Sequence, residues 1–412
     1  MAIIVQKYGG TSVANADKIK RVAARVARTK DQGNKVVVVV SALGQTTDEL
    51  VALAHQVAKE PSGREFDMLV STGEQVSIAL LAMALHDIGY DAISFTGSQV
   101  GIVTDSSHTR ARIISADRKR MMRELDKDRV VIVAGFQGVS EGQEITTLGR
   151  GGSDTTAVAL ATVLPADVCE IYTDVDGVFT ADPRIVPNAR KMPAVSYDEM
   201  LELASAGAKV LHLRAVELAK NYDVKLHVRS SFTEEEGTVV VAETQEMERV
   251  MIGGVSLDKE EAKLSLAGVP DVPGIAAKLF TALADCGINV DMIVQSVGED
   301  GLNTISFTVT KSDLRLALQI TEKVGAELGA KRVESDPGIA KVSAVGAGMR
   351  SHSGVAAKMF RALGDAGINI HMISTSEIKL SCVVDESRAE EAVQVVHEAF
   401  KLGTLTVEGT AE

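Results

Sequence analysis

Apolar residues in the first half of the chain follow two spacings that alternate along the sequence. Residues 35–40 form a β-branched run without polar alternation, which is typical of a strand buried on both faces of a sheet. Residues 12–30 instead repeat valine and isoleucine at the spacing of one helix face. Strands and helices that alternate over this length predict a mostly parallel sheet with helices on both of its faces.

This pattern comprises six strands and seven helices before the composition changes. The expected strands are residues 2–5, 35–40, 91–95, 130–134, 168–172 and 224–228, and residues 100–114 are a candidate hairpin. The expected helices are residues 12–30, 47–59, 73–87, 115–127, 155–163, 196–204 and 206–222. The sequence becomes acidic and polar near residues 231–249, which indicates that a first domain spans residues 1–245.

The second half contains an internal repeat. Residues 273–293 return as residues 353–373 with thirteen of the 21 positions identical, which indicates a duplicated module. The copies predict the strand and helix order βαββαβ, which is the ferredoxin-like arrangement. We expect the two copies to be domains at residues 263–337 and 338–412, with residues 250–256 as an edge strand for the second copy.

A glycine-rich turn at residues 148–157 has the composition of an anion-binding loop. Its glycines let the backbone approach a ligand closely, and the free amides and dipole of the following helix favour negative charge. Ser153 or Asp154 is expected to cap that helix, and Arg150 adds a cationic fork suited to carboxylate or phosphate. Taken alone, this stretch is equally compatible with an ordinary turn before a capped helix.

Four further glycine- or hydroxyl-rich junctions precede predicted helices, at residues 7–12, 41–48, 71–75 and 173–184. In a parallel sheet such junctions fall on the carboxyl edge of the strands, where ligands bind. Five of them together could hold a nucleotide and a second anionic substrate. Each is also compatible with a purely structural helix start, and neither a Walker P-loop nor a Rossmann GxGxxG motif is present in the sequence.

Charge and composition argue against several classes of function. The formal net charge is −13 without a basic block, which disfavours nucleic acid or an anionic membrane as a partner. No apolar run approaches the length of a membrane span, and the scattered histidines predict no metal ligands in the chain. The three cysteines, Cys169, Cys286 and Cys382, are expected to be buried free thiols of a reducing cytoplasm.

In combination, residues 7–12, 71–74, 148–154 and 172–178 with the triplet at 182–184 resemble the signature set of the aspartate kinase family. The duplicated module resembles the paired regulatory ACT domains of that family, and the resemblance covers essentially the whole chain in the right order. It implies an α/β fold: a three-layer αβα amino-acid-kinase domain, carbamate-kinase-like, with a mainly parallel sheet. Two ferredoxin-like ACT domains would follow it.

The resemblance further implies that ATP and Mg²⁺ serve the phosphorylation of L-aspartate to 4-phospho-L-aspartate in the cytoplasm. This is the first step toward lysine, threonine, methionine and diaminopimelate, here in a monofunctional enzyme without a homoserine dehydrogenase domain. The attacking side-chain carboxylate, with a free pKa of about 3.9, is already ionised at neutral pH, so the reaction requires no general base. It requires charge neutralisation and in-line positioning of the reacting groups.

The same resemblance assigns roles to individual residues. Lys7 would be the cation on the transferring phosphoryl group, with Asp154 orienting it. Arg150 would bind the α-carboxylate of aspartate, and Glu74 would pair with its α-ammonium. The substrate site would further include Thr47, Gly151, Gly152 and Ser153. The nucleotide pocket would comprise Lys7, Tyr8, Gly9, Gly10, Ser41, Thr173, Asp174, Phe179, Asp182, Arg184, Lys209 and Val210.

The ACT modules carry the regulatory hypothesis. The family resemblance implies an effector pocket between paired modules, with lysine and/or threonine as inhibitors and assembly into a homo-oligomer or an α2β2 complex. The second copy has His371 where the first has Asp291, so it has lost a carboxylate. The expected pocket residues are Asp271, Gly274, Ala276, Asn289, Asp291, Gln295, Asn369 and Ile370. A purely structural dimerisation module, and an internal start near Met251 that yields a separate regulatory chain, remain alternatives.

Two other functional hypotheses fit parts of the sequence. The same fold could phosphorylate glutamate, N-acetylglutamate or a nucleoside monophosphate. The pair Arg150 and Glu74 favours a free amino acid, because an acylated one has no ammonium for Glu74. A non-catalytic amino-acid sensor would need only the ACT modules, and the intact lysine, arginine and aspartate positions of the first half argue against it.

Overall fold

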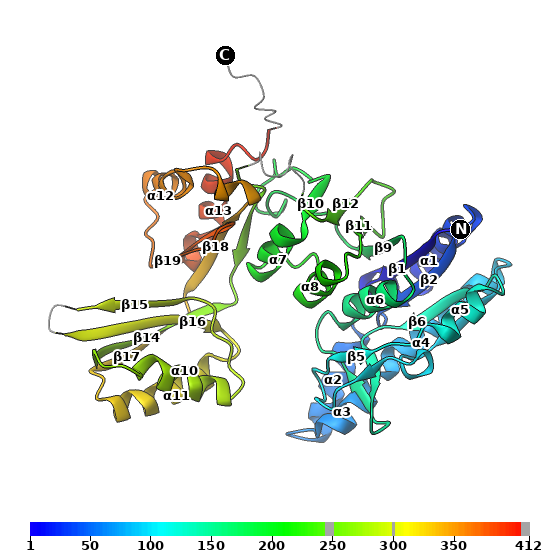
Figure 1. Ribbon diagram of the computed structural model, residues 1–412, viewed down its shortest axis with the longest axis horizontal. Helices are drawn as coiled ribbons and strands as arrows, with labels where there is room; N and C mark the ends of the chain where they lie inside the picture. Colours follow the sequence, from blue (N-terminus) through cyan, green and yellow to red (C-terminus); the bar gives the residue numbers. More distant parts are fainter. Residues whose placement is uncertain (244–250, 299–300, 405–412) are drawn as a thin grey trace, which may run out of the picture. The chain divides into compact units, whose positions relative to one another are not determined.

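The computed structural model describes residues 1–243, 251–298 and 301–404 (Figure 1). The chain divides into two compact units. The first unit holds Met1–Val178, Lys191–Ala204 and residues 209–243, and the second holds Phe179–Arg190, Ser205–Ala208 and the described residues from 251 onward. Two short stretches of the first half thus belong to the second unit. The expected domain boundary at residue 245 lies outside the described residues.

An eight-stranded sheet forms the centre of the first unit, in the order β10-β12-β11-β9-β1-β2-β6-β3. Neighbouring strands are parallel except for β11 and β12. The central strands β2 and β6 are buried along nearly their whole length, as their unbroken apolar runs predict. The strands are β1 (Ile3–Tyr8), β2 (Lys35–Val40), β3 (Ala92–Phe95), β6 (Val130–Ala134), β9 (Val168–Thr173), β10 (Ala194–Ser196), β11 (Leu226–Ser230) and β12 (Thr238–Val241).

Helices cover both faces of this sheet. The described α-helices of this half of the chain are α1 (Ala16–Asp31), α2 (Thr46–Val57), α3 (Gly63–Val70), α4 (Thr72–Asp87), α5 (Lys119–Leu125), α6 (Gly152–Val163), α7 (Tyr197–Ser205) and α8 (Leu213–Asn221). Residues from α1 and α4 pack with Val36 and Val38 of β2 in one apolar cluster. The alternate residues Val37 and Val39 face the other side, where α6 contacts β2 and lies beside α8. This is the predicted three-layer αβα arrangement.

A second, smaller sheet in this unit has the order β5-β4-β7-β8. The predicted hairpin is present as β4 (Val103–Thr104) and β5 (Ile113–Ser115), which are antiparallel. The sequence analysis missed β7 (Gln137–Ser140) and β8 (Ile145–Thr147), because strands this short leave little periodicity to read. The 3₁₀ turns η1 (Gly10–Ser12) and η2 (Ser98–Val100) complete the unit.

Three expectations for helices of the first unit were wrong in part. The helix expected at residues 206–222 begins only at Leu213, and Gly207 has φ +104°, outside the helical region. Helix α3 was not expected at all. The continuous helical stretch Gly63–Asp87 passes a length and composition test for crossing a membrane, contrary to the sequence analysis. Half of its most apolar window is buried inside the protein, as in the core helix of a globular fold.

The second unit contains two four-stranded antiparallel sheets, ordered β15-β16-β14-β17 and β13-β18-β20-β19. The first copy consists of β14 (Glu261–Pro270), α10 (Ile275–Asp285), β15 (Ile293–Val297), β16 (Leu302–Thr310), α11 (Leu314–Leu328) and β17 (Arg332–Asp336). The second consists of β18 (Ile339–Val345), η3 (Ala347–Arg350), α12 (Val355–Asp365), β19 (Met372–Thr375), β20 (Lys379–Asp385), η4 (Glu386–Arg388) and α13 (Ala389–Ala399). Both sheets have the strand order of a ferredoxin-like fold.

The second copy takes its fourth strand from the chain that precedes the first copy. Strand β13 (Gly254–Asp258) pairs antiparallel with β18, at the edge for which the sequence nominated residues 250–256. Of that segment, Val250 lies outside the described residues. The β13 strand therefore occupies the position that β17 occupies in the first sheet.

Equivalent positions of the two copies meet at a buried ion-pair cluster. Lys341, 3% exposed, lies eighty residues after Glu261 and has its Nζ 3.3 Å from the Glu261 carboxylate. Its Nζ also binds the Asp291 carboxylate and lies 3.9 Å from that of Asp258. Burial raises the pKa of Glu261, and the surrounding carboxylates outweigh burial and raise that of Lys341. Residues Met292 and Met372, also equivalent, share a small apolar cluster with Ile339.

The cysteines differ from one another in exposure. Cys169 and Cys382 are buried free thiols, as predicted. Cys286 is exposed, contrary to the prediction, because it is the C-cap residue of α10 and lies past the last buried turn of that helix.

Candidate active site

A buried ion pair lies at the carboxyl edge of the central sheet. Lys7 is the penultimate residue of β1, and its Nζ lies 2.6 Å from Oδ1 of Asp154 in the first turn of α6. The two side chains are only 12% and 11% exposed. A lysine and a carboxylate that far from bulk water attract each other strongly and hold each other in place. The structure thus brings together the two predicted catalytic residues, which lie 147 positions apart in the sequence.

The start of α6 differs from the prediction. Its N-cap is Gly151 at φ +66°, in the left-handed region, and the helix begins at Gly152. Ser153 and Asp154 therefore lie inside the first turn and do not cap the helix. A Cβ at Gly151 would lie 2.1 Å from Cγ of His212, so both the backbone conformation and the packing require glycine. The start shifts because Gly151 adopts the cap conformation itself, which leaves the Asp154 carboxylate free to pair with Lys7.

Two loops of the sheet edge pack on each other through their backbones. A Cβ at Gly10 would lie 2.9 Å from the carbonyl oxygen of Ala42, and the amide of Gly44 donates to the carbonyl of Gly10 at 3.0 Å. The Ser41 hydroxyl in turn donates to Ser153 Oγ at 2.9 Å. The loops after β1 and β2 and the first turn of α6 therefore form one continuous polar edge, as predicted for a parallel sheet.

Glu74 is a buried carboxylate for which the described residues supply no cationic partner. It is 2% exposed, and Oε1 accepts a hydrogen bond from the Ala42 amide at 3.1 Å. Its Oε2 has no hydrogen-bond partner among the described residues. Burial raises the pKa of Glu74 to about 7, because desolvation disfavours the charged form. A buried acceptor of this kind favours a ligand that brings a positive charge.

The junction that carries Glu74 is not the kind that the sequence analysis expected. Residues 71–75 follow α3 and open α4, so the junction joins two helices and does not follow a strand of the sheet. Gly73 nevertheless packs against this edge, because a Cβ there would lie 2.8 Å from Cβ of Ala42. Glu74 thus reaches the edge from the first turn of α4, as the sequence predicted.

The remaining predicted substrate residues are more exposed. Arg150 is exposed in the loop before α6, and Thr47 is half-buried in the first turn of α2. Gly152 is buried against Phe136, since a Cβ at Gly152 would lie 3.0 Å from its ring. Arg150 precedes Asp154 by four residues, and an exposed guanidinium of this kind can bind a carboxylate.

The predicted nucleotide residues divide between the two units. Thr173 ends β9 with its hydroxyl donating to Asp174 at 3.1 Å, and Lys209 and Val210 lie in the loop before α8 of the same unit. Phe179, Asp182 and Arg184 belong to the second unit. The Arg184 Nη2 group donates to Asp182 at 2.6 Å and holds the pKa of Asp182 below its usual value.

The side chain of Tyr8 lies in the core of the first unit. Its ring is fully buried and stacks on the Tyr172 ring with centroids 4.7 Å apart. Its hydroxyl donates to Gln6 at 3.2 Å, and burial raises the Tyr8 pKa well above its usual value. The ring packs in the apolar cluster of the α1 layer, so the expected place of Tyr8 in the nucleotide site stays a prediction that concerns its backbone.

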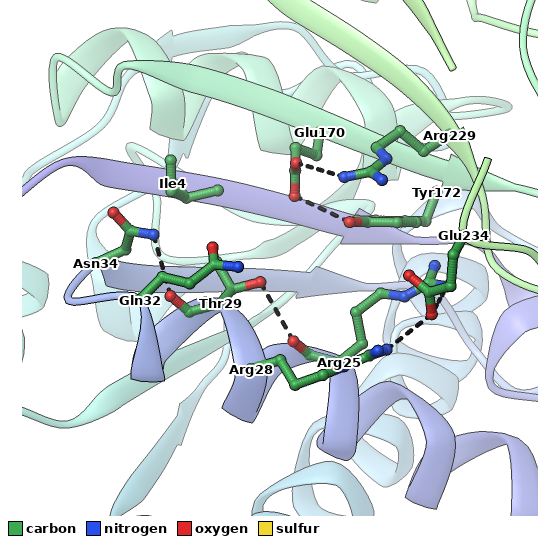
Figure 2. A pocket seen from close by; sticks show the side chains of 10 residues that line it. All are labelled: Ile4, Arg25, Arg28, Thr29, Gln32, Asn34, Glu170, Tyr172, Arg229 and Glu234. Carbon is green, nitrogen blue, oxygen red and sulfur yellow. Dashed lines mark hydrogen bonds and ion pairs between the residues drawn. The ribbon is translucent and has the colours of Figure 1, made fainter. Parts of the chain in front are cut away.

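A separate pocket of about 230 Å³ lies between α1 and the strands β9 and β11 (Figure 2). Arg25 stacks over the Tyr172 ring at 4.8 Å, and Arg229 lies 3.4 Å from the Glu170 carboxylate. Arg25 and Arg28 both donate to Glu234. Each arginine of this pocket is already paired with a carboxylate, and none of the predicted catalytic residues lines it. We interpret it as a network of paired charges between α1 and these strands.

The sequence analysis missed several residues that hold the site together. Arg214 in α8 donates from Nη1 to the carbonyl of Leu148 at 2.6 Å and from Nη2 to that of Ala111 at 2.9 Å. His212 packs against Gly151, and burial lowers its pKa. Asp67 in α3 is completely buried. Their sequence surroundings give no signal, because their roles depend on segments more than thirty residues away.

The second unit contains a pocket of about 420 Å³ at the start of α10. It brings together four of the predicted effector residues, Asp271, Gly274, Ala276 and Gln295. It adds Asn303, which the sequence analysis missed and whose Nδ2 donates to Asp271 at 2.7 Å. Asn289, Asp291, Asn369 and Ile370 do not line this pocket. The carboxylate of Asp291 is instead engaged by Lys341.

Comparisons with known proteins agree with this architecture. Residues 2–230 match the model of the amino acid kinase family, and residues 264–324 and 342–400 match the ACT domain. The chain is 53% identical to an aspartokinase of Mycolicibacterium smegmatis over 408 residues, which cover 98% of this chain and 97% of the relative. The fold and the two repeats thus define an amino acid kinase with ACT domains.

Solved structures give the same result. The chain resembles E. coli aspartokinase III in complex with aspartate and ADP, with a TM-score of 0.82, 29% identity and coverage of 96% of this chain and 99% of that one. It resembles the same enzyme in complex with lysine and aspartate with a TM-score of 0.75, at 29% identity and with coverage of 97% and 99%. The chain belongs to the aspartokinase family, and it is an ATP-dependent kinase.

Proposed function

We propose that this kinase transfers the γ-phosphoryl group of ATP to the side-chain carboxylate of L-aspartate and releases 4-phospho-L-aspartate and ADP. The reaction would be the cytoplasmic entry step to lysine, threonine, methionine and diaminopimelate. The observation that carries the proposal is the buried Glu74 carboxylate, whose Oε2 lacks a hydrogen-bond partner among the described residues. It lies on the same polar edge as the Lys7–Asp154 pair.

The transfer step needs charge neutralisation, because an ionised carboxylate must approach an anionic phosphoryl group. Lys7 supplies the positive charge, and Asp154 fixes the position of its ammonium at 2.6 Å. The nucleophile is already ionised at neutral pH, so no residue has to remove a proton. Gly9 and Gly10, together with the Ser41 hydroxyl, would contact phosphate oxygens at the same edge.

The substrate amino acid would be held at both of its α-substituents. Its ammonium would bind the buried Glu74 carboxylate, and its α-carboxylate would bind the Arg150 guanidinium, with Ser153 and Thr47 as further donors. Pairing with the ammonium offsets the desolvation cost that raises the Glu74 pKa. An N-acylated amino acid would leave Glu74 unpaired, and an unpaired buried polar group costs binding free energy. This reasoning favours a free amino acid over N-acetylglutamate.

The nucleotide would extend from this edge toward Thr173, Asp174, Lys209 and Val210, and by family resemblance toward Phe179, Asp182 and Arg184. Mg²⁺ in kinases is bound through one or two carboxylates and the substrate phosphates, and it neutralises their charge. Asp154 fits that requirement, because its buried carboxylate lies next to the lysine proposed to contact the phosphoryl group. We propose that Asp154 would also hold a water of the nucleotide-bound Mg²⁺.

The decisive experiment is an ATP-dependent hydroxamate assay with L-aspartate, L-glutamate and N-acetyl-L-glutamate as acceptors. We expect hydroxamate from aspartate alone, and Glu74→Gln should raise the aspartate KM far more than the ATP KM. Turnover of N-acetylglutamate at a comparable rate would reassign the substrate. Absence of hydroxamate with all three acceptors, in a protein that still binds lysine or threonine, would support the sensor hypothesis.

We further propose that the Asp271 pocket binds lysine and/or threonine as a feedback inhibitor. The start of α10 offers amide donors to the α-carboxylate, and the exposed Asp271 carboxylate offers an acceptor to an ammonium. E. coli aspartokinase III, a structural neighbour, has been solved with lysine. Assembly into a homo-oligomer or an α2β2 complex through the ACT modules belongs to the same proposal. Calorimetric titration of the full chain with each amino acid, alone and together, tests it.

A further inference from the structure

Asp67 is a completely buried carboxylate of the first unit. It lies in α3, on neither of the loops that carry the proposed catalytic residues, and it is 0% exposed. A buried carboxylate is costly unless several hydrogen bonds satisfy it. The groups that satisfy this one come from two other segments of the chain.

Asp67 lies within hydrogen-bond distance of three groups of those segments, on residues 108, 109 and 147. The backbone amide of Thr109 donates to Oδ1 and Oδ2 at 3.1 and 3.0 Å, and the Thr147 hydroxyl donates to Oδ1 at 2.5 Å. The His108 ring contributes Nδ1 at 2.9 Å from Oδ2. The carboxylate therefore ties residues 108–109 to the last residue of β8.

Both tied segments lead directly to the loop that carries Arg150. Thr147 precedes Arg150 by three residues. On the other segment, the carbonyl oxygen of Thr109 lies 3.1 Å from the position that a Cβ of Gly149 would take. The loop between β4 and β5 thus lies against Gly149, the residue immediately before Arg150.

Thr109 is held in an unfavourable backbone conformation at this contact. Its φ is +68°, in the left-handed region, which is rare for a β-branched residue. Such a conformation persists only where surrounding interactions determine it. The bonds from Asp67 to its amide and to the neighbouring His108 ring are such interactions. Their effect is to present the Thr109 carbonyl to Gly149.

Arg214 joins the same two segments from α8. Its guanidinium donates to the carbonyl of Leu148, in the loop between β8 and α6 that carries Arg150 (the substrate loop), and to that of Ala111 in the β4–β5 loop. The Ala111 amide also donates to the Thr147 carbonyl at 2.9 Å. The backbone before Arg150 is therefore fixed on one side by Asp67 and on the other by Arg214, while the Arg150 side chain stays exposed.

We propose that Asp67 is a positioning residue for aspartate binding. It fixes the backbone that carries Arg150, so that the guanidinium meets the α-carboxylate of the substrate with little loss of freedom on binding. The inference rests on the proposed role of Arg150 in holding that carboxylate. It assigns Asp67 no contact with substrate and no part in phosphoryl transfer, which takes place at Lys7 and Asp154. Loss of Asp67 should therefore change substrate affinity and leave turnover nearly intact.

The test compares Asp67→Asn with a matched loss of a buried carboxylate elsewhere. Asn keeps the side-chain shape and one acceptor, but it removes the charge and one acceptor oxygen. The control is Glu124→Gln in α5, a 7% exposed carboxylate that pairs with Lys127 and Arg129. We expect Asp67→Asn to raise the aspartate KM about tenfold, with kcat and the ATP KM within about threefold of the unaltered chain. Glu124→Gln should lower the melting temperature without changing the aspartate KM.

A double-mutant cycle with Arg150→Ala shows whether Asp67 acts through Arg150. The KM effect of Asp67→Asn should largely vanish in the Arg150→Ala background. Additive effects, an equal rise of the ATP KM, or an aspartate KM unchanged in Asp67→Asn would each overturn the inference. If Asp67→Asn does not fold, Thr147→Val takes its place in the test. This variant keeps the carboxylate and removes one of its donors, and we expect it to raise the aspartate KM about threefold. An unaltered chain that forms no aspartyl hydroxamate would overturn the proposed function itself.

Discussion

Helices α6 and α10 begin in the same way but serve sites of opposite character. Each follows a glycine N-cap in the left-handed region, Gly151 at φ +66° and Gly274 at φ +97°. The first turn of α6 is buried, whereas the residues before α10 are exposed. A Cβ at Gly151 would meet His212, while one at Gly274 would meet nothing within 4 Å. The same glycine N-cap therefore occurs at both a buried site and a solvent-exposed one.

The difference shows what each site needs. Phosphoryl transfer between anions requires charges that are fixed and shielded from water before the substrate arrives, as Lys7 and Asp154 are. Regulation requires only a modest difference in affinity between two states of the enzyme, about 1–3 kcal/mol in typical cases. An exposed carboxylate such as Asp271, held by one bond from Asn303, is sufficient for that purpose. Substitutions should therefore cost much more at α6 than at α10.

The largest effect should follow from Lys7→Ala. Removing the cation leaves the developing negative charge and Asp154 uncompensated, so kcat should fall by about 10³-fold or more, with a much smaller change in the aspartate KM. Steady-state kinetics with Lys20→Ala as the control tests this, because Lys20 is an exposed residue of α1. Equal losses in kcat and in aspartate affinity would contradict the assigned role.

The next largest effect should be a difference in stability between the two variants Gly151→Ala and Gly274→Ala. Both substitutions force a side chain into the left-handed region at a cost of about 1 kcal/mol. Gly151→Ala should lose about 2 kcal/mol more, because its Cβ would overlap His212. Denaturant unfolding of the two variants gives the comparison. Equal destabilisation would mean that the packing around His212 relaxes freely.

Glu74 should make the stability of the ligand-free protein depend on pH. Its folded pKa of about 7 lies above the reference value of 4.5, so its neutral form contributes stability that is complete below pH 4.5 and is lost as the pH rises through 7. The loss relative to Glu74→Gln should be on the order of 3 kcal/mol between pH 4.5 and 7.5. Thermal unfolding of both proteins across this range, without ligand, measures it. Saturating aspartate should reduce the difference, and a parallel pH dependence in Glu74→Gln would contradict the prediction.

The smallest effect on catalysis should come from the open site. Asp271→Ala removes an exposed carboxylate of the α10 pocket, so inhibition by lysine or threonine should weaken about tenfold while uninhibited kcat stays the same. Inhibition curves for the full chain measure it, and Asp285→Ala at the far end of α10 is a control. Unchanged inhibition in Asp271→Ala would exclude this pocket as the effector site.

The fold was readable from sequence because its signals are local or repetitive. The β-branched runs of β2 and β6 predicted buried strands, and the repeat at residues 273 and 353 predicted two ferredoxin-like modules. Errors arose where the outcome depends on distant packing. The cap of α6 depends on the packing of Gly151 against His212. Spacing along the chain carries no information about such pairs.

The candidate site was predictable to a different extent. Lys7, Glu74 and Asp154 were identified from motifs, and the structure places them on one edge. Asp67, His212 and Arg214 were not, because each supports the substrate loop from another element. A buried carboxylate in a helix has no distinctive neighbours in sequence. Such supporting residues become visible only when their hydrogen bonds are traced.

The pairing of Glu261 with Lys341 makes the two copies of the duplicated module different from each other at their contact. Two identical copies would bring like charges together at this position, and in a buried setting such a contact is repelled. With opposite charges at equivalent positions, the contact between the two copies of this chain is attractive instead. Divergence at this one pair of residues thus makes the two copies complementary. Exchanging the two residues would keep their mutual attraction but would place the glutamate beside Asp291 and Asp258, the carboxylates around position 341.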